Sequence, residues 1–183
     1  TPNTLIVYVD IDATGANNGT SWANAYNSLY IALSGANSGT EIWVAEGVYK
    51  PTTSTNRAFT FYLRDGVEIY GGFAGNETQR SQRDFAAHVT TLSGDLNGDD
   101  GANFANNSEN SYHVVVGATG GVLDGFVITG GNANGSNPFD RGGGILNNAA
   151  NPVLSNLTIN ANTANVGAGM YNDAAQPTLT NVV

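Results

Sequence analysis

Apolar and polar positions repeat at a long interval in the last third of the chain. Equivalent phrases begin at Leu123, Leu154 and Leu179, with spacings of 154 − 123 = 31 and 179 − 154 = 25 residues. The 17-residue stretches that begin at Gly142 and Gly167 agree at 8 positions when one is laid over the other at an offset of 25. A period of 20–50 residues is typical of stacked-repeat proteins. The pattern therefore predicts successive coils of similar structure.

Within one period the alternation predicts three short strands with tight corners. "GGGIL" leads to a corner at Asn147–Asn148, "PVL" to a corner at Ser155–Asn156, and "LTIN" to a looser "ANTANVG" turn. The 31 − 25 = 6 extra residues fall near Asn134 to Asp140. Such a ring cannot bury its own inner face, so each coil needs a neighbour stacked on it at about 4.8 Å. Because side chains alternate along a strand, the predicted inward residues are Ile145, Leu154, Leu157 and Ile159, then Met170, Leu179 and Val182 one coil later.

Asparagines fall at matching positions of successive periods. Stacking in register would place Asn147 below Asn172 and Asn156 below Asn181. Amide side chains stacked in this way hydrogen-bond to one another along the stack. We therefore predict a structural asparagine ladder in the regular coils.

The remainder of the chain is interpreted as part of one continuous domain. Residues 1–40 would form a strand, a loop and a capping helix, residues 41–120 irregular first coils, and residues 121–183 regular coils of about 25 residues, with the chain ending part-way through a coil. Ser21 is expected to cap a helix of about three turns that carries Trp22, Tyr26, Leu29 and Leu33 on one face. Laid across the first coil, this helix would cover its unpaired strand edge.

A leucine-rich repeat is the structural alternative. "LSNLTINAN" fits the leucine spacing of that family, with Leu154, Leu157, Ile159 and Asn162 in the expected places. The rest of the period, "ANVGAGMYNDAAQP", lacks the leucines that would anchor a convex helix. The sequence therefore favours an all-β fold, a right-handed parallel β-helix (a solenoid) with a short N-terminal capping helix.

Composition and charge narrow the classes of function. Only 11% of the residues are charged, and six Lys+Arg against 15 Asp+Glu give a net charge of −9. A phosphate surface would repel such a chain, so we expect no nucleic-acid partner. No run of 18 apolar residues is present, so we expect no membrane span in this segment. The chain has no cysteine, so packing and backbone pairing must supply its stability.

The stretch "DLNGDDG" is a candidate calcium loop. Asp95, Asn97 and Asp99 alternate as the first three ligands of a Ca²⁺ loop do. Position twelve is Asn106, where an EF-hand needs a bidentate Glu, so an EF-hand is excluded. Two interpretations remain open: a partial Ca²⁺ site completed by backbone carbonyls or by Glu109, and a polar turn that faces water. The sequence indicates no other cofactor.

Charged residues are scarce in the regular coils, and this weakens any catalytic interpretation. Asp140 and Arg141, on the expected insertion, are the only acidic–basic pair within the repeats, and we interpret them as a solvated loop pair rather than as catalytic residues. Glycosidase chemistry needs two facing carboxylates at a defined separation. Asp124 and Asp173 are candidates for one side of the coils, but nothing in the sequence fixes their distance.

Several blocks along the chain resemble a known class of proteins. They are, in order, "YVDIDATGANNGTSWANAYNSL", "EIWVAEGVYKP", "GVEIYGGFAGNE", "LSGDLNGDD" and "LDGFVITGGNANG", followed by "GGGILNN" and "GAGMYND". Together they resemble bacterial right-handed parallel β-helix proteins that are secreted or attached to the cell surface, with pectate-lyase-like coils and polymorphic-outer-membrane-protein-like repeats. The resemblance runs nearly end to end. It implies the fold, whereas proteins of this fold have many functions.

The resemblance implies a secreted or bacterial cell-surface location. We expect a non-catalytic structural or adhesive scaffold whose partners are other surface proteins or a polysaccharide, with end-to-end self-association into fibres as a further expectation. The alternative is a polysaccharide lyase or hydrolase that acts on an acidic or neutral glycan. Lyases of this fold use acidic residues to hold Ca²⁺ on a uronate, and an Arg or Lys on the same face as the base.

Overall fold

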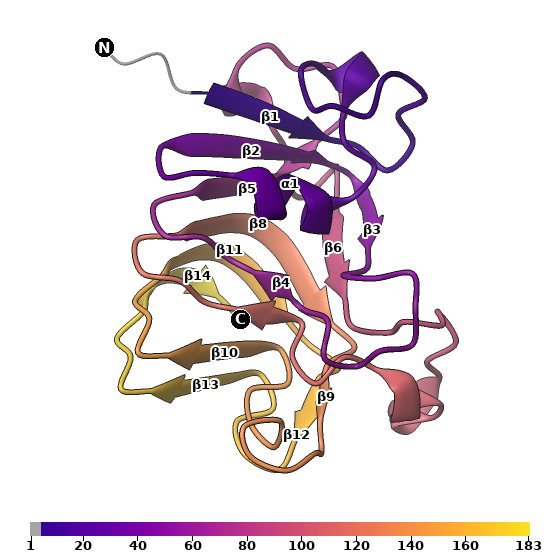
Figure 1. Cartoon of the computed structure of the whole chain (residues 1–183), viewed down its shortest axis with the longest axis vertical. Coiled ribbons are helices and arrows are strands. Elements are labelled where there is room, and N and C mark those ends of the chain that lie inside the picture. The colour runs from indigo at the N-terminus through magenta and orange to yellow at the C-terminus, as the bar shows by residue number, and fades with distance from the viewer. Residues whose placement is uncertain (1–4) are drawn as a thin grey trace.

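The computed structural model describes residues 5–183, whose strands wind into the coils of a right-handed parallel β-helix (Figure 1). The largest sheet has eight strands, and its main path follows the order β1-β2-β5-β8-β11-β14, so each coil adds one strand to it. All of its pairings are parallel. The strands of this sheet are β1 (Leu5–Val9), β2 (Thr40–Ala45), β3 (Gly47–Tyr49), β5 (Glu68–Phe73), β6 (Thr90–Ser93), β8 (Val122–Thr129), β11 (Val153–Ile159) and β14 (Thr178–Val182).

Two smaller parallel sheets complete the coils. One has the order β13-β10-β7-β4 and the other pairs β12 with β9. The strands are β4 (Phe61–Tyr62), β7 (Val115–Val116), β9 (Asn132–Ala133), β10 (Ile145–Asn148), β12 (Thr163–Ala164) and β13 (Met170–Asp173). The helical elements are η1 (Trp22–Asn24), α1 (Leu29–Gly35), η2 (Arg80–Gln82), η3 (Ala102–Phe104) and η4 (Asn107–Glu109).

Equivalent aliphatic residues of successive coils lie directly over one another in the core. Ile42 pairs with Ile69, Ile69 with Leu123, Leu123 with Leu154, and Leu154 with Leu179. The first four are fully buried, whereas Leu179 is 50% exposed in the last strand of the stack. The register thus runs back through the coils that the sequence marks as irregular. Their irregularity lies in the long loops that follow β5 and β6.

The regular coils confirm the stacking but revise the predicted strands. "PVL" and "LTI" form the single strand β11, in which Asn156 takes a positive φ of 50°. A third strand, β12, lies inside the predicted "ANTANVG" turn and pairs with β9. The alternative interpretation as a leucine-rich repeat is therefore wrong, because the stretch that would have to lead into a convex helix forms a paired strand instead.

The six-residue insertion is confirmed. From the end of β9 to the start of β10 the chain advances from Ala133 to Ile145, which is 12 positions. The same step one coil later, from Ala164 to Met170, takes 6 positions. Ile145 and Met170 nevertheless pair in register. The extra residues form a loop outside the stack.

The predicted helix from Ser21 to Leu33 is wrong in its extent. Ser21 caps only the short η1, and α1 begins at Leu29 with Ser28 as its N-cap. The residues between them are extended because Tyr26 pairs with the outer edge of β1: its N–H donates to the Tyr8 carbonyl at 2.9 Å, and its carbonyl accepts from Asp10 N–H at 2.9 Å. The loop before α1 therefore covers the first strand edge.

The helix α1 has a different place from the predicted one. It packs beside β4 and β1, with Leu29, Ala32 and Leu33 buried in the main core. Figure 1 shows it next to β4, on the side of the sheet β13-β10-β7-β4. In the first coil it thus lies where later coils have a strand. Within residues 5–183 no helix is long and apolar enough to cross a membrane.

Candidate functional site

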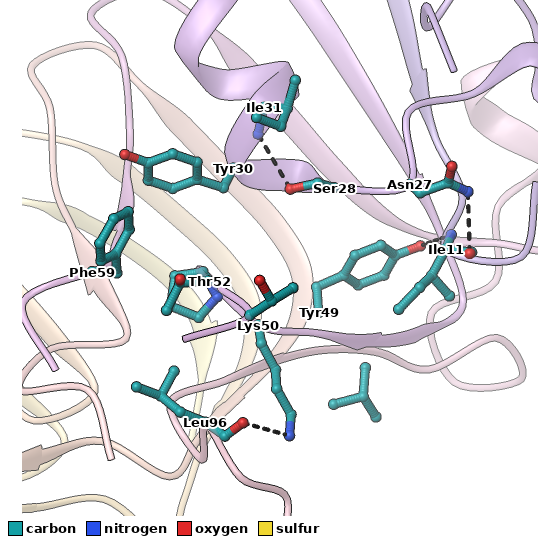
Figure 2. A pocket seen from close by; sticks show the side chains of 13 residues that line it. Ile11, Asn27, Ser28, Tyr30, Ile31, Tyr49, Lys50, Thr52, Phe59 and Leu96 are labelled. Atoms are coloured by element: carbon teal, nitrogen blue, oxygen red, sulfur yellow. Dashed lines mark hydrogen bonds between the residues drawn. The ribbon is translucent and has the colours of Figure 1, made fainter. Parts of the chain in front are cut away.

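A cavity lies where α1 meets the strand β3 and the loop that follows it. It measures about 680 Å³. Figure 2 shows Tyr30 and Phe59 facing each other across one end, with ring centroids 5.5 Å apart. Aliphatic side chains also line the pocket: Ile31 and Val48 are each 51% exposed. The pocket therefore offers partly exposed aromatic and aliphatic surface to a ligand.

Two polar side chains of this pocket, Lys50 and Tyr49, hold its walls in place. Lys50 Nζ donates to the Leu96 carbonyl at 3.2 Å. The hydroxyl of Tyr49 donates to the Ala45 carbonyl at 3.1 Å and accepts from the Ile11 N–H at 3.2 Å. Burial is the main reason that the pKa of Tyr49 is raised far above its ordinary value, so this hydroxyl stays protonated. These contacts fix the walls of the pocket.

The two residues of the predicted acidic–basic pair, Asp140 and Arg141, bind each other. Arg141 Nε donates to Asp140 Oδ1 at 2.8 Å and its Nη2 to Asp140 Oδ2 at 3.2 Å, while its Nη1 donates to the Tyr171 hydroxyl at 3.3 Å. The hydrogen bond that Arg141 donates to Asp140 is the main cause that raises the pKa of Arg141 further above its ordinary value, and the same bond lowers the pKa of Asp140. An arginine that removes a proton needs a pKa lowered towards the working pH. The pKa of Arg141 is raised, so this pair is suited to a structural role.

The two carboxylates considered for hydrolysis are on different sheets. Asp124 belongs to β8 in the large sheet and Asp173 ends β13 in the second sheet. Asp124 is also neutralised, because Arg83 Nη2 donates to its Oδ2 at 2.8 Å. The structure therefore does not bring these two residues together as a facing pair.

Asparagine side chains stack along two rows of the coils. Asn147 Nδ2 donates to Asn172 Oδ1 at 2.8 Å, and Asn181 Nδ2 donates to Asn156 Oδ1 at 2.9 Å. The second row continues one coil further, because Asn156 Nδ2 donates to Asp124 Oδ1 at 2.8 Å. The row thus ends on the carboxylate that Arg83 neutralises, which the spacing of asparagines alone did not predict.

The candidate calcium loop contains an acidic cluster with a different membership from the predicted one. Asp95, Asp100 and Glu109 each place a carboxylate oxygen within 4.8 Å of the others. Asp99 is not in this group; its backbone N–H donates to Asp95 Oδ1 at 3.3 Å. Asn97 is exposed. Burial, with smaller contributions from the charges of Asp95 and Asp99, raises the pKa of Asp100.

All six lysine and arginine side chains donate to acceptors of this chain. Three arginines pair with carboxylates, and the other two arginines and the lysine bind backbone carbonyls. The contacts are Arg80 with Glu41 and Glu68, Arg83 with Asp124, Arg141 with Asp140, Arg57 with Asn110 and Asn132, Arg64 with Leu33, and Lys50 with Leu96.

Sequence reasoning missed the pocket and the acidic cluster for the same reason. Each brings together residues that are far apart along the chain: Tyr30 of α1 with Phe59, and Asp95 with Glu109 near opposite ends of one long loop. The local spacing of ligand-type residues carries no signal for such contacts. One residue of the acidic cluster outside the "DLNGDDG" stretch was indicated by the sequence: Glu109, as a ligand that would complete the calcium site.

Comparison with known proteins identifies one matching family. No curated protein and no solved structure matches the chain. One family model does, over residues 11–183, and its description is "Protein of unknown function (DUF1565)". Because the match spans nearly the whole chain, the chain belongs to the DUF1565 family.

Proposed function

We propose that this chain is a non-catalytic, secreted or cell-surface β-helix scaffold with an adhesive pocket beside α1. The observation that carries the proposal is the engagement of every lysine and arginine side chain within the fold. A lyase of this fold class needs a basic side chain that is free to remove a proton next to a bound uronate. Within residues 5–183 each candidate base already has a structural partner.

The pocket supports adhesion to a neutral polysaccharide in particular. Aromatic rings such as Tyr30 and Phe59 present flat apolar faces, and sugar rings have matching apolar faces. The rim also carries the hydroxyl groups of Thr52 and Thr53. The net charge of −9 disfavours acidic polymers through long-range repulsion. Other surface proteins are the second class of partner compatible with this surface.

Self-association end to end is opposed at one end of the described stack. The loop before α1 already pairs with β1 through Tyr8, Asp10 and Tyr26. A second copy could add a strand there only after displacing this loop. The proposal therefore places adhesion at the pocket and does not require fibres.

Two measurements on the same protein test the proposal. The chain is incubated with pectin, alginate and xylan while the ultraviolet absorbance of unsaturated product and the release of reducing ends are followed; we expect neither to rise. Binding to insoluble neutral polysaccharides is measured by co-sedimentation. Replacing Tyr30 or Phe59 by Ala should weaken binding about tenfold, which corresponds to the loss of one aromatic contact worth about 1.4 kcal/mol.

A matched control and two contrary outcomes complete the test. Tyr62 is an exposed tyrosine outside this pocket, so Tyr62→Ala should bind as the unaltered chain does. Equal binding by the Tyr30, Phe59 and Tyr62 variants would show that this pocket is not the place where the polysaccharide binds. Sustained product release that disappears in Arg141→Ala would instead establish the polysaccharide lyase, and any release of reducing ends without unsaturated product would indicate a hydrolase.

A further inference from the structure

The loop between β6 and β7 brings three carboxylates together at the scale of one metal ion. One oxygen each of Asp95, Asp100 and Glu109 lies within 4.8 Å of the others. Ca²⁺ binds oxygen ligands at about 2.4 Å, so two ligands on opposite sides of the ion are about 4.8 Å apart. All three oxygens therefore fit on one Ca²⁺ coordination sphere.

A second and independent observation points to a ligand at this place. Glu109 Oε1 is buried and has no hydrogen-bond partner. The next side chain, Asn110, is 1% exposed, and its Oδ1 is likewise buried without a partner. Leaving such oxygens unsatisfied is costly, and buried polar atoms in folded proteins almost always have a partner. A cation bound among the three carboxylates would satisfy Glu109 Oε1.

The Asn110 amide is directed at the cluster. Its Nδ2 donates to Asp100 Oδ2 at 2.7 Å. The oxygen and the nitrogen of an amide have nearly the same shape, so rotation of the amide would place Oδ1 where Nδ2 now lies. Asn110 can thus exchange a donor for an acceptor when a cation arrives, and become a neutral oxygen ligand.

The local charge also favours a cation. None of the three carboxylates forms an ion pair among the described residues. Lys50 is the cationic side chain whose charge acts on Asp100, and its Nζ binds the Leu96 carbonyl. A cavity of about 440 Å³ that is lined by Asp95, Asp100 and Phe104 adjoins the cluster and provides a path for entry.

We propose that Asp95, Asp100 and Glu109, together with Asn110, form a Ca²⁺ site that fixes the loop between β6 and β7 onto the coils. The ligands are hard oxygens on a loop, which suits Ca²⁺ better than Mg²⁺, an ion that demands near-ideal octahedral geometry. Asp95 is anchored next to β6, whereas Glu109 and Asn110 lie at the far end of the loop. The ion therefore connects both ends of this loop.

The experiment is a calorimetric titration of the chelator-treated chain with CaCl₂, accompanied by thermal unfolding with and without Ca²⁺. We expect one site with a dissociation constant of about 0.1–1 mM, the range of extracellular modules, and a rise in Tm on adding Ca²⁺. Asp100→Asn and Glu109→Gln should each weaken binding about tenfold or more. The control Asp65→Asn removes a charge from an exposed turn and should bind as the unaltered chain does.

The unfolding measurement separates a ligand from a merely structural residue. Without Ca²⁺, Glu109→Gln should be as stable as the unaltered chain or more stable, because it relieves repulsion between carboxylates. A Glu109→Gln variant that is destabilised without Ca²⁺, yet binds the ion as before, would overturn the assignment. So would the absence of binding at 10 mM (roughly ten times the weakest expected dissociation constant), equal binding by all variants, or equal affinity for Mg²⁺.

Discussion

Buried asparagines in this fold differ in what they hold together. Asn162 is 8% exposed and makes three short hydrogen bonds to backbone groups: its Nδ2 donates to the carbonyls of Ile128 at 2.9 Å and Asn160 at 2.8 Å, and its Oδ1 accepts from Gly131 N–H at 2.8 Å. Asn147 is fully buried but makes a single bond, to Asn172. Its Oδ1 has no partner.

The two asparagines should therefore contribute unequally to stability. We expect Asn162→Ala to lower the free energy of unfolding by about 3 kcal/mol, since it leaves the buried Gly131 N–H unpaired and removes two further hydrogen bonds. We expect Asn147→Ala to lower it by about 1 kcal/mol or less. Urea unfolding followed by circular dichroism measures both. Asn148→Ala, at an exposed neighbouring position, is the control. A larger loss for Asn147 than for Asn162 would contradict this account.

His113 makes stability depend on pH. Burial lowers the pKa of its imidazole below the ordinary 6.5, and its Nδ1 lies 3.1 Å from the Gly142 carbonyl. Below about pH 6.5 the unfolded chain binds a proton that the folded chain does not, so stability falls as the pH decreases towards the folded-state pKa. In His113→Gln this part of the pH dependence should disappear. Unfolding curves between about pH 7.5 and 5 test this, and identical slopes for both proteins would refute it.

At the scale of elements, the protected strand edge at β1 shows where local patterns fail. Trp22, Tyr26, Leu29 and Leu33 have helical spacing, but Tyr26 pairs with β1 and breaks the expected helix in two. A strand edge that needs a partner outweighs a weak helical preference. Two serines could each cap a helix, and only the tertiary contact selects Ser28 as the start of α1.

Gly19 allows this edge-protecting loop to approach β1. It has a φ of 73°, its carbonyl accepts from Tyr8 N–H at 3.0 Å, and an added Cβ would lie 2.6 Å from the Tyr26 ring and 2.9 Å from Val7. Gly19→Ala should displace the loop, expose the β1 edge and cause self-association that grows with concentration. Gly39→Ala is a matched control, since Gly39 has a φ of 88° but no atom within 4 Å of an added Cβ.

Analytical ultracentrifugation and thermal unfolding of the two glycine variants measure the effect. Both variants share the cost of a side chain at positive φ, about 1 kcal/mol, and only Gly19→Ala adds the clash. If both remain equally monomeric and equally stable, the loop is not what protects this edge.

At the scale of the whole molecule, one register connects every coil. The sequence predicted the stack because the stretches that begin at Gly142 and Gly167 match at one offset, so that Asn147 and Asn172, like Asn156 and Asn181, are 25 residues apart. It did not predict that the same register continues through Ile42 and Ile69, because long loops after β5 and β6 conceal the period. Repeats of constant length can be found by alignment, whereas loops of variable length hide the same geometry.

The predictability of the candidate sites follows the same division. The ladder pairs were predictable because each joins residues 25 positions apart on successive coils. The acidic cluster and the pocket depend on how irregular loops fold back on the stack. Of the three carboxylates, the sequence predicted Asp95, offered Glu109 only as a completing ligand and did not indicate Asp100. Regular hydrogen bonding between coils fixes the ladder pairs. Individual loop contacts fix the acidic cluster and the pocket.

The loop inserted between β9 and β10 has a practical consequence. It adds six positions to one coil, yet Ile145 still pairs with Val115 on one side and Met170 on the other. Foreign peptide spliced into this corner, for instance an epitope or an affinity tag, would project outward without shifting the rungs above and below. The loop between β9 and β10 thereby provides one fixed position at which a peptide can be displayed on the side of the β-helix.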